Sequence, residues 1–355
     1  MGPRRDVRLE LLRRTAPGTP LREAIDRVVQ LGRGGLILIA DREVASPVIA
    51  AGFELNAPFT PQAIGELSKM DRAVVVDEDL RTILYANAHL VPDPTLPSQE
   101  TGTRHRVAEQ IARQLDRPVI AISEERRQVT LYLGEWKYEL QEIQTLISQV
   151  SQGLLILDRY RRELRDLLTE LAPLEFEQRV LPYHVAAVIQ RILQMIDLEK
   201  EIKLGLVELG MHKELPERHL AGLMRGVREE LEFIVRDFQT DPSRPAEEVM
   251  EELLGMSREE LVNPEAVLKP LGLVDEEDLE RPLPSRGYRL LSKIPRLPMS
   301  VIERLVQEVG ALDQLQRANR RQLEKVKGIG EARARAIKYG LARFKTGYAA
   351  ILEGF

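Results

Sequence analysis

The apolar run GGLILIA at residues 34–40 decides the fold of the first part of the chain. Glycine opens the run and Asp41 follows it, and a continuous apolar run with such borders is typical of a strand buried on both faces. Similar runs follow at residues 73–76, 82–86, 118–122 and 129–133. Apolar residues at helical spacing occur at 1–30, 61–70 and 104–115. Strands that alternate with helices predict an α/β domain around a mixed central sheet, which we place at residues 1–140.

The pattern becomes helical from residue 140 onward. Leucine and isoleucine recur at three- and four-residue intervals through 143–171, 179–209 and 217–238, and glycine and proline fall mainly between these runs. We therefore predict an all-α spine over residues 141–285, which ends in shorter helices and turns over 247–280. The charged residues of the spine are interpreted as solvated faces, because their pattern matches no catalytic constellation.

The composition excludes several classes of protein. The 355 residues allow two or three domains, each with a core of its own. There is no cysteine, which excludes disulfides, thiolate zinc sites and cysteine nucleophiles. The opening residues MGPRRDVRLELLRR lack the apolar centre of a signal peptide, and no run approaches the roughly 18 apolar residues that span a bilayer. We therefore expect a cytoplasmic protein without a membrane partner.

Charge is distributed unevenly along the chain, although the whole carries only −5. Over residues 246–280, twelve acids stand against two bases, a net charge of −10. Over residues 286–345, fifteen bases stand against five acids, a net charge of +10. A basic terminal module is typical of a nucleic-acid binder. We therefore predict a DNA-binding domain at residues 286–355 and association with the nucleoid.

A motif within this module resembles a helix-hairpin-helix element, with the sequence LEKVKGIGEARARAI at 323–337. In such an element the Gly-Ile-Gly turn lets backbone N–H groups face a phosphate, and Ile329 anchors the turn in the core. Such contacts bind DNA without reading its sequence. The predicted DNA-binding residues are Lys327, Gly328, Ile329, Gly330, Arg333 and Arg335. The alternative is an ordinary turn between two helices. Residues 294–309 resemble a degenerate partner hairpin, to which we assign a structural role.

The sequence TGTRHR at residues 101–106 precedes one of the predicted helices of the first domain. Thr103 or a neighbour is expected to cap the helix. Backbone N–H groups at a helix start, together with Arg104 and Arg106, form a ready anion site. The alternative is a capped surface helix with solvated arginines.

Two further segments belong with this one. Asp71 stands directly before a predicted buried strand, where it is suited to hold a divalent metal or to accept a proton from a hydroxyl. Its alternative role is that of a turn or cap residue. The polar loop YANAHLVPDP at residues 85–94 follows another predicted strand.

Together the blocks KMDxA at 69–73, YANxHLVPDP at 85–94 and ETGTRHR at 100–106 resemble the diadenylate cyclase family. With the helical spine and the helix-hairpin-helix module behind them, all 355 residues resemble the members of that family that scan DNA integrity. The resemblance implies synthesis of cyclic di-AMP from two ATP with Mg²⁺ or Mn²⁺. It also implies DNA as a partner, with branched DNA or recombination intermediates as the expected form, and a homo-octamer in which two cyclase domains face each other.

The resemblance also implies roles for individual residues. Asp71 is expected to bind the metal and to help activate the attacking hydroxyl. Arg104, His105 and Arg106 are expected to hold phosphates and the developing charge, which gives the catalytic set Asp71, Arg104, His105 and Arg106. The predicted ATP-binding residues are Arg72, Ala73, Leu90, Thr103, Arg104, His105, Arg106, Val107 and Ser123, with Leu90 at the adenine. Phosphoryl transfer needs mostly positioning and cations, so no Walker A sequence is required.

Four positions depart from the family pattern. Arg72 stands where the family has the glycine of its Asp-Gly-Ala motif, and Val107 stands where it has threonine. Glu124 and Glu125 stand where it tends to have basic or polar residues. These departures favour a second hypothesis, a DNA-binding scaffold with a catalytically impaired cyclase domain that retains nucleotide binding. A third hypothesis is a nuclease or repair factor that reaches DNA through its hairpin.

Overall fold

The computed structural model describes residues 3–273 and 280–346, and the chain divides into two compact units. The first unit comprises Met1–Ser151 and Lys203–Glu217, and the second comprises Gln152–Ile202 and Arg218–Phe355. The predicted domain boundaries at residues 140 and 285 stay predictions. Of the shorter helices and turns predicted over 247–280, residues 274–279 lie outside the described residues, as do residues 347–355 of the predicted DNA-binding domain.

A seven-stranded sheet forms the centre of the first unit, in the order β2-β4-β3-β1-β5-β6-β7. The strands are β1 (Gly35–Ile39), β2 (Ile49–Pro58), β3 (Ala73–Val76), β4 (Thr82–Leu90), β5 (Val119–Ile122), β6 (Val129–Leu133) and β7 (Trp136–Leu140). Only β1 and β3 pair in parallel, with Leu36 opposite Ala73, and all other neighbouring strands are antiparallel. The prediction of a mixed sheet is therefore confirmed.

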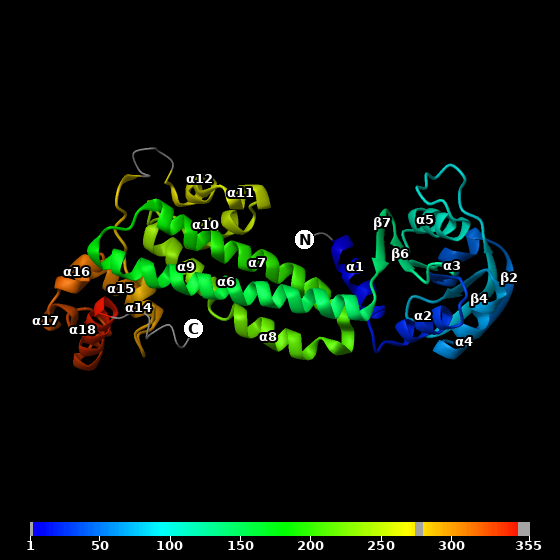
Figure 1. Ribbon diagram of the computed structural model, residues 1–355, viewed down its shortest axis with the longest axis horizontal. Coiled ribbons are helices and arrows are strands. Elements are labelled where there is room, and N and C mark those ends of the chain that lie inside the picture. The colour runs from blue at the N-terminus through cyan, green and yellow to red at the C-terminus, as the bar shows by residue number, and fades with distance from the viewer. Residues whose placement is uncertain (1–2, 274–279, 347–355) are drawn as a thin grey trace. The chain divides into compact units, whose positions relative to one another are not determined.

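Helices cover both faces of this sheet, and β1 is buried along its whole length. Side chains of one face, such as Ile37, pack with α2 (Pro20–Gln30) and α4 (Pro61–Leu67). Side chains of the other face, such as Leu38, pack with α5 (Thr103–Leu115). Figure 1 shows α5 on one side of the sheet and α2 with α4 on the other. This two-sided burial is the reason for the continuous apolar runs.

Two strands, β2 and β7, were not predicted from the sequence. Strand β2 is an edge strand whose residues are almost all exposed, and Asn56 within it has a positive φ of 51°. Strand β7 is the opposite edge and alternates between half-buried and exposed positions. Neither edge is buried enough to require the apolar run by which the other strands are recognised.

Further helices lie wholly within the first unit. They are α1 (Pro3–Arg14), α3 (Arg42–Ala45) and the 3-10 helices η1 (Ser46–Val48), η2 (Ser68–Met70) and η3 (Gly210–His212). The segment from Lys203 to Glu217 also belongs to this unit. Within it, Glu208 accepts hydrogen bonds from the Tyr138 hydroxyl and from the Gln141 N–H, the latter at 3.0 Å.

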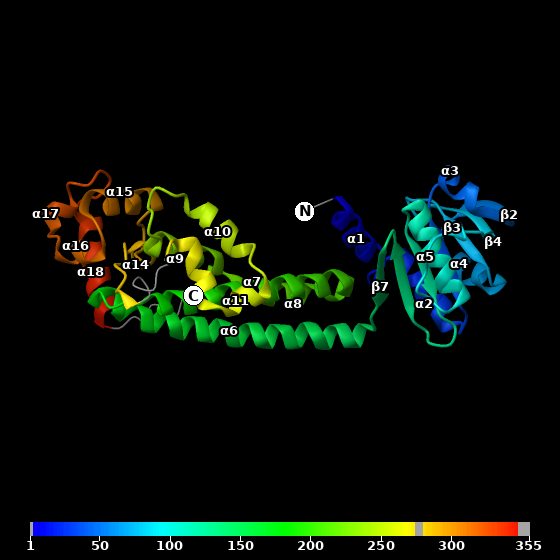
Figure 2. The ribbon, with the colours of Figure 1, turned by 90° about the horizontal axis from the view of Figure 1, so that it is seen from above.

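Helices α6 (Ile143–Glu177) and α7 (Pro182–Leu209) are long and antiparallel, and they lie side by side in Figures 1 and 2. Within the second unit the Arg191 guanidinium on α7 lies 2.9 Å from the Glu163 carboxylate on α6. Further helices are α8 (Glu214–Met224), α9 (Val227–Phe238), α10 (Ala246–Leu254), α11 (Arg258–Val262), α12 (Pro264–Leu268) and the 3-10 helix η4 (Lys269–Leu271). The prediction of a helical region after the sheet is therefore confirmed.

A buried ion network ties α14 (Tyr288–Ser292) to the helices beside it. Arg289 is fully buried and hydrogen-bonds the Glu175 carboxylate of α6, which is also fully buried. Its guanidinium also lies 3.8 Å from the buried carboxylate of Glu230 on α9. The Lys293 ammonium binds the other oxygen of Glu230 at 2.8 Å.

Asp237, at the end of α9, completes this network. Its carboxylate accepts the backbone N–H groups of Tyr288 and Arg289 at 2.7 and 3.0 Å. Burial and the neighbouring charge of Glu175 raise the pKa of Asp237 to about 7, although the two N–H donors work in the opposite direction. Burial likewise raises the pKa of Glu175 against the pull of Arg289. Removing Arg289 would leave the buried carboxylates of Glu175, Glu230 and Asp237 with less positive charge to compensate them.

The last helices are α15 (Met299–Val309), α16 (Leu312–Arg317), α17 (Arg320–Leu323) and α18 (Glu331–Thr346). The turn after α14 and the turn after α17 share one pattern of burial. Ile294 and Leu297 of the first turn are buried like Val326 and Ile329 of the second. Arg296 has a φ of 63° at the position where Gly328 has a φ of 98°. The two turns therefore share a positive φ at the same position, where the first has arginine and the second has glycine.

Candidate nucleotide-binding site

A pocket of about 700 Å³ opens beside the sheet of the first unit. Ten residues of this unit were predicted to be catalytic or to bind ATP, and nine of them line the pocket: Asp71, Arg72, Ala73, Leu90, Thr103, Arg104, His105, Val107 and Ser123. The exception is Arg106, which is exposed on α5 and does not belong to the lining. The volume lies within the usual range for small-molecule sites.

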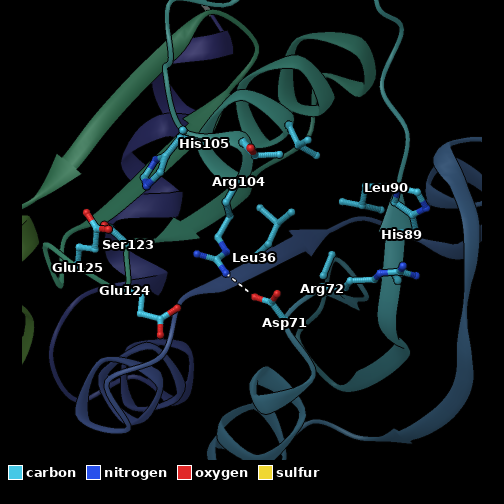
Figure 3. Close-up of a pocket in the computed structure, with 15 residues that line it drawn as sticks. Leu36, Asp71, Arg72, His89, Leu90, Arg104, His105, Ser123, Glu124 and Glu125 are labelled. Atoms are coloured by element: carbon cyan, nitrogen blue, oxygen red, sulfur yellow. Dashed lines mark hydrogen bonds and ion pairs between the residues drawn. The ribbon is translucent and has the colours of Figure 1, made fainter.

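Asp71 and Arg104 form an ion pair in this pocket, with 2.8 Å between the carboxylate and the guanidinium (Figure 3). The Asp71 side chain is 85% exposed, and its backbone is left-handed, with a φ of 61°. Aspartate is among the few residues that tolerate this conformation, which is enriched at functional sites. It directs the carboxylate into the pocket, directly before β3.

Arg104 extends across the backbone of Gly34, at the start of β1. A side-chain carbon at Gly34 would lie 2.0 Å from the Arg104 guanidinium, so any larger residue there would displace the arginine. Glycine at this position leaves room for the guanidinium to lie against the backbone. The pair with Asp71 and the path across Gly34 fix the orientation of Arg104 before any ligand binds.

The start of α5 differs from the expected one. Gly102 is the N-cap residue, and no side chain caps the helix, so the prediction of Thr103 or a neighbour as the capping side chain is wrong. Thr103 is already the first helical residue, because the Arg106 N–H bonds the Gly102 carbonyl at 2.9 Å. The loop before α5 is held instead by Glu109, whose carboxylate accepts the Ser98 hydroxyl at 2.5 Å and the Gln99 N–H at 3.1 Å. The first N–H groups of α5 therefore stay uncapped by any side chain at the pocket.

His105 is oriented by a chain of hydrogen bonds that the sequence did not reveal. The Lys137 ammonium lies 2.8 Å from the Glu100 carboxylate, and the Tyr132 hydroxyl donates to the same carboxylate at 2.9 Å. The His105 Nδ1 lies 3.0 Å from the Tyr132 hydroxyl oxygen. Because that hydroxyl gives its single hydrogen to Glu100, it accepts a hydrogen bond from Nδ1–H. Nε2 is then the nitrogen of His105 left to accept a hydrogen bond from a ligand.

Burial and neighbouring groups set the protonation states in this chain of hydrogen bonds, which we call the His105 relay. Burial lowers the pKa of His105, so the ring is neutral at pH 7. Burial and the hydrogen bond to Glu100 raise the pKa of Tyr132 well above its usual value. Burial favours protonated Glu100, but hydrogen bonds from Lys137 and Tyr132 outweigh it and keep the pKa of Glu100 below its usual value. The relay therefore presents a neutral imidazole of one tautomer to the pocket.

Comparison with known proteins places this pocket in a family. Residues 22–136 match the model described as DisA bacterial checkpoint controller nucleotide-binding, and residues 140–280 match the DisA bacterial checkpoint controller linker region. The DNA integrity scanning protein DisA of Carboxydothermus hydrogenoformans is 40% identical over 344 residues, which cover 96% of this chain and 98% of the relative. The chain belongs to the DisA family.

A second DisA protein, from Symbiobacterium thermophilum, is 40% identical over 341 residues and covers 96% of both chains. A solved structure of DacA from Staphylococcus aureus is 19% identical, covers 38% of this chain and 88% of its own, and has a TM-score of 0.30. That score is too low to bear on the fold. Membership of the DisA family establishes a nucleotide-binding domain with ATP as its implied substrate. Within residues 3–273 and 280–346, no helix is long and apolar enough to cross a bilayer.

The four positions at which the sequence analysis expects departures from the family pattern all line this pocket. Figure 3 shows Arg72 extending away from Asp71 and Arg104, on the side of the pocket where His89 and Leu90 lie. Val107 lines the pocket without a hydroxyl. Glu124 and Glu125 line it as exposed carboxylates in the turn after β5. The pocket therefore holds acids as well as cations.

The residues predicted to bind DNA lie around the turn between α17 and α18. Ile329 is only 4% exposed, as expected of an anchor, and Gly328 has a φ of 98° that favours glycine. The Arg333 guanidinium donates to the Gly328 carbonyl at 2.5 Å. Arg335 forms an exposed pair with Glu331 at 2.7 Å.

Part of the basic charge counted in the sequence serves the fold instead. Arg289 is buried in the ion network, and Arg286 donates to the carbonyls of Arg236 and Gln239 at the end of α9. Lys338 donates to two carbonyls near the end of α16, at 2.7 and 2.8 Å. The surface available to a polyanion is accordingly less basic than the count of +10 suggests.

Proposed function

We propose that this member of the DisA family is a diadenylate cyclase that condenses two ATP into cyclic di-AMP. The observation that carries the proposal is the convergence of Asp71, Arg104 and His105 on one pocket of the nucleotide-binding domain. Asp71 and Arg104 come from segments 33 residues apart, and their pairing sets a carboxylate beside a cation where a triphosphate would lie. Positioned charges of this kind are what phosphoryl transfer requires.

In the proposed reaction each 3′-hydroxyl oxygen attacks the α-phosphorus of the other nucleotide. The bond from that phosphorus to the bridging oxygen of pyrophosphate breaks, and the hydroxyl proton is lost, so two ATP give one cyclic di-AMP and two pyrophosphates. A pocket that holds one nucleotide supplies only half of these groups. The reaction therefore requires two copies face to face, in line with the octamer implied by the family resemblance.

Asp71 accepts the proton of the attacking hydroxyl, and Arg104 stabilises negative charge on the phosphates. His105, neutral and held through Nδ1, offers Nε2 to the nucleotide. Leu90 and Ala73 supply apolar surface for the adenine. Arg106 is exposed outside the pocket of its own copy, and its predicted contact with phosphate stays a prediction.

The residues present fit Mg²⁺ or Mn²⁺ as an ion held largely by substrate. Within the described residues there is no group of three metal-ligating side chains, which excludes an all-protein cage in that part of the chain. Asp71 is an exposed carboxylate in the pocket, and Mg²⁺ commonly takes one or two carboxylates together with substrate phosphates. When bound, such an ion would neutralise charge on the phosphate oxygens.

The decisive assay incubates the full chain with ATP and Mn²⁺ or Mg²⁺ and measures cyclic di-AMP by chromatography, with and without branched DNA. We expect product in the absence of DNA and a rate that DNA alters. Absence of product under every condition, with ATP binding retained, would leave the scaffold hypothesis standing in its place.

A scaffold with an impaired cyclase domain is the second candidate, because Glu124 and Glu125 place two exposed carboxylates in the pocket that would receive a triphosphate. The direction of Arg72, away from Asp71, supports the active enzyme instead. Arg72→Gly separates the two. An active enzyme should change its rate by less than about threefold, the effect of roughly 0.7 kcal/mol, whereas a scaffold blocked by Arg72 should gain activity.

We also propose that the turn between α17 and α18 binds DNA phosphates without reading sequence, through Lys327, Gly328, Ile329, Gly330, Arg333 and Arg335. The support is the glycine conformation at 328, the buried Ile329 and the basic module around them. Binding of this kind weakens steeply as salt rises, since each neutralised phosphate releases counterion. An affinity that barely changes between low and moderate salt would contradict the proposal.

A further inference from the structure

The nucleotide pocket brings a cation into direct contact with the carboxylate that is expected to bind the metal. The Arg104 guanidinium lies 2.8 Å from one oxygen of the Asp71 carboxylate. Within residues 3–273 and 280–346, this is the only ion pair or hydrogen bond that either side chain forms. The pair therefore occupies the group that the proposed reaction requires for Mg²⁺ or Mn²⁺.

Asp71 by itself offers a divalent ion little. The part of the chain that the structure describes contains no group of three metal-ligating side chains, so Asp71 has no second and third protein ligand beside it. An ion at its other carboxylate oxygen would lie close to the positive charge of Arg104, and like charges at such distances repel each other. Divalent ions should therefore bind Asp71 poorly as long as Arg104 is paired with it.

The pairing with Asp71 is particular to Arg104. Its guanidinium lies against the backbone of Gly34, and only 23% of its side chain is exposed, so it is directed toward the carboxylate. Arg72, the other arginine that lines this pocket, follows Asp71 directly in the sequence but extends away from it (Figure 3). The pocket thus contains one cation that contacts Asp71 and one that does not.

The start of α5 supplies a reason for Arg104 to leave Asp71. Its first residues line the pocket, and no side chain caps the helix, so its first N–H groups can bind a phosphate. Arg104 is the second residue of the same helix, within reach of a phosphate bound there. Arginine binds phosphate through two parallel hydrogen bonds, whereas its present partner is an exposed carboxylate. A phosphate at α5 should therefore draw the guanidinium away from Asp71.

We propose that Arg104 keeps divalent ions from Asp71 until a nucleotide binds, so that Asp71 takes up its metal ion only together with the nucleotide. The inference rests on the cyclase function proposed above and adds an order of binding to it. Once the phosphates hold Arg104, the Asp71 carboxylate is free to share a divalent ion with them, which is the usual way in which Mg²⁺ is held at such sites.

The test titrates the full chain with Mn²⁺ in the absence of nucleotide and measures free Mn²⁺ by electron paramagnetic resonance. Binding that is lost in Asp71→Asn belongs to Asp71. Arg104→Met should strengthen this binding about fivefold, the factor that corresponds to the loss of one ion pair of about 1 kcal/mol. Arg104→Met combined with Asp71→Asn should bind no more Mn²⁺ than Asp71→Asn alone.

Arg72→Met is the matched control, because it removes the same charge from the same pocket but no contact with Asp71. It should strengthen Mn²⁺ binding less than twofold. A second titration uses saturating 3′-deoxy-ATP, which lacks the attacking hydroxyl and cannot condense. There Arg104→Met should no longer bind Mn²⁺ more tightly than the wild-type protein, because the nucleotide has already separated the pair.

Three outcomes would contradict the inference. Equal effects of Arg104→Met and Arg72→Met, or no effect of Arg104→Met, would show that the pair does not exclude the ion, and would leave the proposed cyclase intact. Tighter Mn²⁺ binding by Arg104→Met that persists with 3′-deoxy-ATP would show that the nucleotide does not separate the pair. Failure of the wild-type protein to bind 3′-deoxy-ATP would overturn the proposed function itself, and the order of binding with it.

Discussion

Two arginine–carboxylate pairs in this protein have the same chemistry and opposite surroundings. In the nucleotide pocket, Arg104 is 23% exposed and its partner Asp71 is 85% exposed. In the helical unit, Arg289 and its partner Glu175 are both fully buried. The first pair is open to solvent and ligand, whereas the second is closed off by α6, α9 and α14.

The difference in burial separates what the two pairs contribute. An exposed ion pair contributes about 0–1 kcal/mol to the stability of a protein. Asp71 and Arg104 can therefore separate and bind a substrate at little cost in free energy. A buried pair is costly to break, because the remaining charge has neither water nor a partner. The pair in the pocket is therefore suited to chemistry, and the pair in the helical unit to holding α14 in one position.

The largest effect should come from Arg289→Met. It leaves Glu175, Glu230 and Asp237 buried with less cationic compensation and should lower the free energy of unfolding of the helical unit by about 3–5 kcal/mol. Scanning calorimetry and hydrogen exchange of α14 measure the loss.

Two controls sharpen this result. Arg104→Met removes a cation from the exposed pair and should cost no more than about 1 kcal/mol. The double substitution Arg289→Met with Glu175→Leu removes both charges and should recover part of the stability lost by Arg289→Met alone. Equal stabilities of Arg289→Met and Arg104→Met would show that burial does not separate the two pairs.

Asp71→Asn should have the opposite consequences, a large loss of activity and a small change in stability. The amide keeps the shape of the side chain but accepts no proton and binds a divalent cation poorly, so the rate of cyclic di-AMP formation should fall at least about 100-fold. The unfolding free energy should change by less than about 0.5 kcal/mol, as for surface substitutions in general. Asp79→Asn is the control, because Asp79 is exposed in the same unit and does not line the pocket. A rate within twofold of the unchanged protein would remove Asp71 from the reaction.

The sequence predicted the interior of the sheet well and its edges poorly. Strands such as β1 are buried on both faces, which imposes an apolar run, whereas β2 is exposed along nearly its whole length and carries no such constraint. Most of the pocket residues lie in short sequence blocks that could be recognised as motifs. Nine of the ten predicted residues line a single cavity.

The relay behind His105 was missed for a related reason. Tyr132 lies in β6, a fully buried strand that was interpreted only as a hydrophobic run. Its hydroxyl meets Glu100 and His105 from segments 32 and 27 residues away, a contact that tertiary packing alone creates. A single hydroxyl-bearing ring in a buried strand was the available signal, since a buried tyrosine usually has a hydrogen-bond partner.

The smallest effect, and the finest test of the pocket, should come from Tyr132→Phe. Loss of the hydroxyl leaves the ring packed in the core but removes the acceptor for Nδ1–H of His105, so the imidazole should no longer be held in one tautomer. Nitrogen-15 NMR spectra of His105 should show the Nδ1–H tautomer alone in the wild-type protein and a mixture of both tautomers in the variant. The cyclase rate should fall about tenfold, the effect of roughly 1.4 kcal/mol.

The dependence of the cyclase rate on pH should report the protonation state of His105. Because burial lowers the pKa of His105, the ring stays neutral as the pH falls below 6.5, the ordinary value for histidine. The acid limb of the rate profile of the unchanged protein should therefore lie below pH 6.5. Lys137→Met, which leaves Tyr132 and Glu100 in place, is the control and should alter the tautomer less than Tyr132→Phe does. Two outcomes would contradict this role of the relay: an acid limb above pH 6.5, or identical spectra for the wild-type protein and Tyr132→Phe. Either would mean that the relay does not set the protonation and tautomer of His105, and that Asp71 and Arg104 alone distinguish this pocket from the buried network.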